Sequence, residues 1–241
     1  MTADRISGPA ARRLLVLPVA VTVALGATAC SGDSSGDSSG TGLSYAKVRS
    51  TAEQLRQQPS TACPFGLDGL ATALRDAGID RPVTPGAKDA KAVEGELGDG
   101  TPPYPWPSGI SPSPTTASAP GLPPHAWVTC TWTAGTATVR LDLEAVPLSD
   151  VGVSVMLPTL QRTGQLTADQ LGEVVTGRPK PGGKPVLLPG AGLGAIARVP
   201  LKDDGDLVLL LSQGDADPAD PALTGEPLAK VLEQLQGRIH G

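Results

Sequence analysis

The chain has 241 residues, a formal net charge of −5 and an aromatic share of only 2%. This length allows one or two domains, and a core would consist mainly of Val, Leu, Ile and Ala. The Lys and Arg residues are scattered, so the chain lacks the basic footprint of a nucleic-acid-binding protein and the polybasic cluster that binds an anionic bilayer. We therefore expect no nucleic-acid partner.

Residues 1–29 have the order of a bacterial secretory signal. A positively charged segment ends at Arg13, an apolar stretch runs from Leu14 to Leu25, and small residues lead to Cys30. This order predicts a signal peptide, and Ala27-Thr28-Ala29-Cys30 resembles the lipobox, whose cysteine receives a diacylglyceryl group. The apolar stretch is shorter than the roughly 20 residues of a membrane-spanning helix. A retained anchor helix and an ordinary signal peptide with a free Cys30 are the alternatives.

Residues 30–42 continue as a Ser/Gly-rich segment of the kind that tethers a domain to its anchor. We therefore expect export and attachment to the extracytoplasmic side of the cell membrane through lipid on Cys30. The remaining cysteines, Cys63 and Cys130, form an even pair in an oxidising compartment, which predicts a disulfide. Two buried free thiols are the alternative, and neither cysteine has metal-ligand spacing.

The domain is expected over residues 43–241. Apolar positions three and four apart predict a helix from Tyr45 that ends at Pro59, and a second short helix that ends at Gly78. Proline is then dense, and we expect an exposed Pro-rich insertion at about 82–124 with little to pack. A polyproline segment that docks in a partner's groove is the alternative.

The period of the pattern changes to two at Trp127. Residues 127–132 and 137–145 alternate between apolar and polar, which predicts an antiparallel hairpin with its turn at Gly135. The polar positions of the second strand (Thr138, Arg140, Asp142 and Glu144) are expected to face water. Alternating valines predict a further short strand over 151–155.

The last third of the chain mixes helix and strand signals. Thr167 and Gln170 form a capping-box pattern, which predicts a short helix through Val175. Apolar runs at 186–188, 193–199 and 206–212 predict three more strands, and a closing helix begins at Pro227. Helices at the start and end with strands between them predict an α+β domain built on an antiparallel sheet.

Several short motifs resemble a known family. They are Cys63-Pro64 before the second helix, Cys130-Thr131-Trp132 before an alternating strand, and the segment LPGAGLGAIA at 188–197. With the lipobox and the tether, they resemble a family of actinobacterial exported lipoproteins of unknown function over roughly 43–241. The resemblance implies an extracytoplasmic α+β fold with one disulfide between Cys63 and Cys130. It implies no catalytic residues.

No motif of catalysis or metal binding fits its context. The segment GDSSG at 32–36 imitates a serine-protease nucleophile but lies in the tether. Strand-like residues, not a helix, follow the glycines at 190–194, and the aspartates at 203–220 lack EF-hand spacing. His125 and His240 have no carboxylate or thiolate placed to assist them. We therefore expect no catalytic, cofactor-binding or metal-binding residues and no enzymatic activity.

The sequence favours a non-enzymatic binding or accessory module of the cell envelope. Its sheet face or a cleft between helix and sheet would receive an apolar ligand or an envelope protein. The alternative is a sensor or assembly subunit that works through a membrane protein partner, by way of the insertion at 102–124. An envelope hydrolase is the weakest of the three hypotheses.

Overall fold

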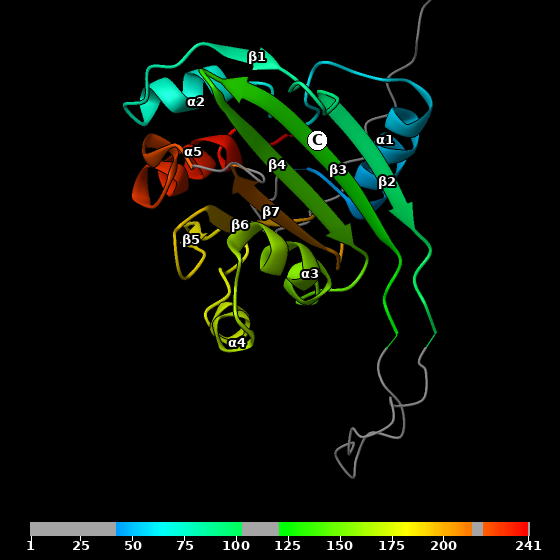
Figure 1. Ribbon diagram of the computed structural model, residues 1–241. Helices are drawn as coiled ribbons and strands as arrows, with labels where there is room; N and C mark the ends of the chain where they lie inside the picture. Colours follow the sequence, from blue (N-terminus) through cyan, green and yellow to red (C-terminus); the bar gives the residue numbers. More distant parts are fainter. Residues whose placement is uncertain (1–41, 103–120, 214–218, 241) are drawn as a thin grey trace, which may run out of the picture. The chain divides into compact units, whose positions relative to one another are not determined.

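The computed structural model describes residues 42–102, 121–213 and 219–240 (Figure 1). The predicted signal peptide, the predicted lipid-attachment residue Cys30 and most of the predicted tether lie outside these ranges, as do residues 103–120 of the predicted insertion. None of the helices in the described ranges combines the length and the apolarity that crossing a membrane requires.

The described residues form an antiparallel sheet of seven strands with helices before, within and after it, which confirms the predicted α+β class. The elements in chain order are α1 (Tyr45–Gln57), α2 (Leu70–Asp76), β1 (Val83–Pro85), β2 (Val93–Gly98), β3 (His125–Ala134), β4 (Ala137–Val146), α3 (Gly152–Gly164), α4 (Ala168–Thr176), β5 (Val186–Leu187), β6 (Gly194–Pro200), β7 (Asp206–Ser212), a 3-10 turn (Pro221–Leu223) and α5 (Glu226–Gln236).

The strand order is β1-β3-β4-β7-β6-β5. β2 also pairs with β3: β1 pairs with residues 132–134 of β3, and β2 pairs with residues 125–130. Helices cover both faces of this sheet (Figure 1). One face packs with α1, α2 and α5 in the larger apolar cluster, whereas the other packs with α3 and α4 in a smaller one. The sheet is therefore the middle of three layers.

Local signals explain most of the elements. The Ser44 side chain caps α1 by accepting a hydrogen bond from the N–H of Lys47 at 3.2 Å. The capping box of Thr167 and Gln170 forms at the start of α4. The β3–β4 hairpin turns at Gly135, whose φ of 65° suits glycine. The predicted helix from Tyr45, the capping box and the hairpin turn are therefore confirmed, as are the three later strands and the closing helix.

Two segments differ from the sequence prediction. The strand predicted over 151–155 is wrong, because α3 occupies it. Val153, Met156 and Leu160 recur at helical spacing and are buried under this helix, so tertiary burial outweighs the strand preference of valine. In addition, β1 and β2 lie within 82–124, where no strand was predicted.

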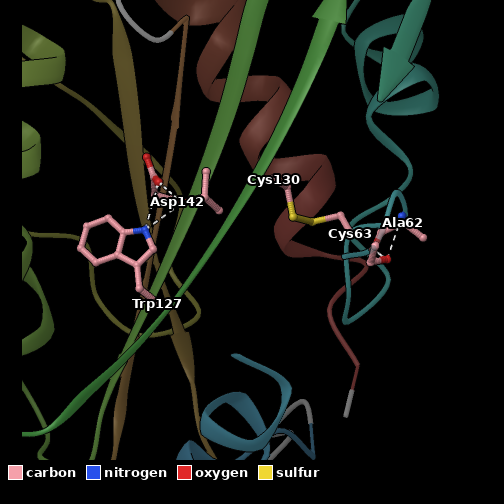
Figure 2. Close-up of a disulfide and its surroundings, with 7 residues drawn as sticks. Ala62, Cys63, Trp127, Cys130 and Asp142 are labelled. Atoms are coloured by element: carbon pink, nitrogen blue, oxygen red, sulfur yellow. Dashed lines mark hydrogen bonds between the residues drawn. A yellow bond between two sulfur atoms is a disulfide. The ribbon is translucent and has the colours of Figure 1, made fainter. Parts of the chain in front are cut away.

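The predicted disulfide between Cys63 and Cys130 is present, with 5.7 Å between the two Cα atoms. It joins the loop after α1 to the middle of β3, and both residues are buried in the larger cluster. Figure 2 shows the disulfide on one side of β3, with Trp127 and Asp142 on the other. The bond therefore fastens one face of the strand whose opposite face carries the site described next.

Candidate functional site

Charged and aromatic side chains line up on the sheet face that α3 covers. The strand pairing sets two rows across β2, β3 and β4, with Glu96, Trp127 and Glu144 in one and Glu94, Thr129 and Asp142 in the next. Every second side chain of a strand points to the same face, so all six lie on one side of the sheet. Trp127 also packs against the apolar cluster of α3.

The structure corrects the expectation that the polar positions of β4 face water. Asp142 and Glu144 are both 0% exposed, and only Thr138 and Arg140 keep partial exposure. Alternation in a sequence identifies the side chains that share a face, but it does not say whether another element covers that face. Here α3 packs on the polar face of β4 and β7.

The buried carboxylate of Asp142 is surrounded by donors. It accepts hydrogen bonds from the indole N–H of Trp127 at 3.1 Å and from the hydroxyl of Thr129 at 2.8 Å. The guanidinium of Arg140 adds bonds of 2.8 and 2.9 Å. These bonds replace the water that the carboxylate loses on burial. They also orient the indole, whose nitrogen is turned toward Asp142 (Figure 2).

Glu144 has a different environment. Neither of its carboxyl oxygens has a hydrogen-bond partner among the described residues. Burial, and secondarily the charge of Asp142, raises the pKa of Glu144 from 4.5 to about 8. An unpartnered buried carboxyl group is more stable in its neutral form, so we expect Glu144 to be protonated at neutral pH.

A cleft of about 500 Å³ opens beside this polar layer. Two exposed carboxylates of β2 and the floor of β3 line it, and cations of β4 and α3 complete it. The lining residues are Glu94, Gly95, Glu96, His125, Trp127, Thr129, Arg140, Thr159 and Arg162. The two lining residues that belong to α3, Thr159 and Arg162, are three positions apart and so lie on one side of that helix.

His125 stands in the wall of this cleft. Its Nδ1 lies 3.2 Å from the carbonyl oxygen of Pro123, and its ring lies against Gly98, the neighbouring residue of β2. A Cβ at position 98 would overlap the ring, so glycine there leaves room for the imidazole. The other histidine, His240, contacts the backbone of Arg238 beside Gly66 and does not line the cleft.

The remaining motifs have structural roles. Gly190 and Gly192 adopt positive φ in a turn before β6, as expected. Among the aspartates, Asp203 accepts from the N–H of Tyr45, and Asp206 pairs with Arg198. Within the part of the chain that the structure describes, no group of three His, Cys, Asp or Glu residues is placed to hold a metal ion.

The sequence analysis missed the cleft, although one signal was present. Residues 93–97 alternate between Val, Glu, Gly, Glu and Leu, which is a strand pattern that places both glutamates on one face. The surrounding prolines obscured it. No local signal shows that α3 brings Thr159 and Arg162 over this face, because they are far from β2 in the sequence.

Comparison with known proteins adds no relative. No family model, curated protein or solved structure matches the chain. The resemblance to exported actinobacterial lipoproteins therefore stays a prediction based on short motifs. What the cleft can bind has to follow from its own residues.

Proposed function

We propose that the protein is a lipid-anchored, non-enzymatic binding module on the extracytoplasmic side of the cell membrane, which holds a small polar ligand in the cleft between α3 and strands β2 to β4. The observation that carries this proposal is the cleft itself. Its volume of about 500 Å³ falls within the range of about 300–1,000 Å³ that is typical of ligand sites. The disulfide supports an oxidising compartment.

The lining favours a polar ligand over the apolar ligand that the sequence suggested. Glutamate and arginine side chains form much of the wall, and two threonine hydroxyls add donors and acceptors. An apolar ligand would strip water from these groups without replacing their hydrogen bonds, which costs free energy. A ligand with polar groups of its own avoids this cost.

The buried acids support a binding role over catalysis. A general base must accept a proton from substrate within hydrogen-bond reach. Asp142 is saturated with donors, and Glu144 is covered and does not line the cleft. The Asp142 carboxylate therefore holds cleft residues in position, and neither buried acid is placed to meet a substrate.

The anchor and the ligand can be tested by mass spectrometry of the full-length protein from bacterial membranes. We expect a lipidated chain that begins at Cys30, and an additional mass in the native spectrum that denaturation removes. A Cys30→Ser variant should stay unlipidated. A chain that keeps Met1 would refute the anchor.

A blocked cleft identifies the place of binding. Glu96→Trp introduces a bulky side chain at an exposed cleft position, and Glu53→Trp at a partly exposed position of α1 outside the cleft lining is the control. We expect the additional mass to disappear only in Glu96→Trp. An additional mass that survives there would refute binding in the cleft. An anchored wild-type protein with no additional mass would favour the second hypothesis, a sensor or assembly subunit that works through a membrane protein.

A further inference from the structure

Opposite charges line opposite sides of the cleft. Glu94 and Glu96 alternate along β2, so both carboxylates stand on the cleft face at one side. Arg140 on β4 and Arg162 on α3 supply the cations at the other side. β3 separates β2 from β4, and neighbouring strands are about 4.8 Å apart, so the backbones of β2 and β4 lie about 10 Å apart.

One charge at each side is free of an ion pair. Among the described residues, the Arg162 guanidinium makes two long hydrogen bonds of 3.4 Å, to the carbonyl of Pro158 and the hydroxyl of Thr159 in its own helix. No described carboxylate lies within ion-pair distance of Arg162, and no described cation lies within that distance of Glu96. In contrast, the Arg140 cation is already held by Asp142. Arg162 and Glu96 are therefore the charges that a ligand could engage.

The floor between these charges is rigid and amphipathic. Trp127 is half-buried, and its N–H is held by both Thr129 and Asp142, so the indole does not need to be ordered when a ligand arrives. An aromatic ring near a carboxylate favours a cationic nitrogen, and a preorganised surface lowers the entropic cost of binding.

We infer that the cleft binds a short zwitterion whose cationic nitrogen faces Glu96 and whose carboxylate faces Arg162, and that a free peptide of two or three residues has this chemistry. This inference rests on the proposed binding function. An extended residue spans about 3.3–3.6 Å, so two or three residues span about 7–10 Å between their charged ends. The cleft volume of about 500 Å³ accommodates a peptide of this length together with its side chains.

Three related ligands test the inference by isothermal titration calorimetry on the full-length protein. They are L-alanyl-L-alanine, its N-acetyl derivative, which lacks the cation, and its C-terminal amide, which lacks the anion. Each blocked derivative loses one charge-assisted hydrogen bond, so we expect it to bind about tenfold or more weakly than the free dipeptide.

Two variants assign the charges to their residues. We expect Arg162→Gln to weaken binding of the free dipeptide and the N-acetyl derivative about tenfold but to leave binding of the amide unchanged. We expect Glu96→Gln to weaken binding of the free dipeptide and the amide about tenfold but to leave binding of the N-acetyl derivative unchanged. Glu53→Gln and Arg56→Gln, an exposed pair on α1, are the matched controls and should change none of the three affinities.

The outcomes separate this inference from the function on which it rests. Equal affinities for all three ligands, or a loss in each variant that is the same for all three ligands, would overturn the zwitterion. If none of the three binds while the native ligand mass is still lost in Glu96→Trp, the ligand class is wrong and the binding function stands. If that native mass also persists in Glu96→Trp, both are wrong.

Discussion

The buried carboxyl group of Glu144 makes a quantitative prediction about stability. Its pKa is about 8 in the folded protein against 4.5 for an ordinary glutamate, because burial disfavours the charged form and Asp142 adds repulsion. Between these two values the unfolded chain is ionised at this position while the folded protein keeps the proton. The folded state then binds one proton more than the unfolded state, so the free energy of unfolding falls as pH rises.

The slope in this interval is about 1.4 kcal/mol per pH unit, which follows from one proton per molecule. Across the whole interval from pH 4.5 to about 8, Glu144 lowers the free energy of unfolding by about 5 kcal/mol. The contribution levels off below the lower pKa, where both states are protonated, and above the upper pKa, where both are ionised.

Glu144→Gln isolates this contribution because the amide keeps the shape and does not titrate. We expect the wild-type free energy of unfolding, measured by urea titration with tryptophan fluorescence, to fall relative to the variant by about 1.4 kcal/mol per unit between about pH 5 and pH 8. Glu173→Gln, an exposed change on α4, should differ from wild type by a pH-independent amount. A constant difference for Glu144→Gln would show that Glu144 is ionised in the folded protein and would refute the reasoning.

Three further changes test the fold and the cleft. Replacing both disulfide cysteines with alanine should lower the free energy of unfolding by about 4 kcal/mol in a denaturant titration, since the bond closes a sequence separation of 67 residues; a loss below about 1 kcal/mol would contradict this model of loop closure. Gly95→Ala should lower the free energy of unfolding by about 1–3 kcal/mol, because the added Cβ meets the backbone of α1. In Gly98→Ala the added Cβ meets the imidazole of His125, so this variant should weaken ligand binding at nearly unchanged stability. Equal melting temperatures for the two variants would contradict this difference. Asp206→Asn should destabilise the protein by about 3–5 kcal/mol, because Asp206 joins buried Arg198 to the first N–H of α3, and faster amide hydrogen exchange in α3 than in β3 would locate the damage.

Short-range sequence patterns were sufficient to predict the helices, strands and caps whose conformation depends on residues close together in the sequence. The cap at Thr167, the alternation over 137–145 and the helical spacing after Tyr45 each depend on residues within a few positions. The disulfide was also predictable, because the predicted export leaves Cys63 and Cys130 with only each other as partners once Cys30 is lipidated. Such signals need no knowledge of the rest of the fold.

The candidate site depends on contacts that these signals do not contain. Glu94 and Glu96 lie in a segment that its proline content made look unpacked, and Arg162 belongs to a helix whose first residues favour a strand. Each becomes a cleft residue only because β2 pairs with β3 and α3 crosses the same face. Their separation in sequence hides this relation.

The sequence by itself determined the class of the fold, the pairing of Cys63 with Cys130 and the face of β4 on which its polar side chains stand. Only the tertiary structure decided that this face is covered, because burial depends on which distant element packs there. The packing of α3 over this face buries Asp142 with its hydrogen bonds satisfied and buries Glu144 without a hydrogen-bond partner among the described residues. It also creates the charged cleft beside them, because side chains from three strands and one helix meet only in the folded chain.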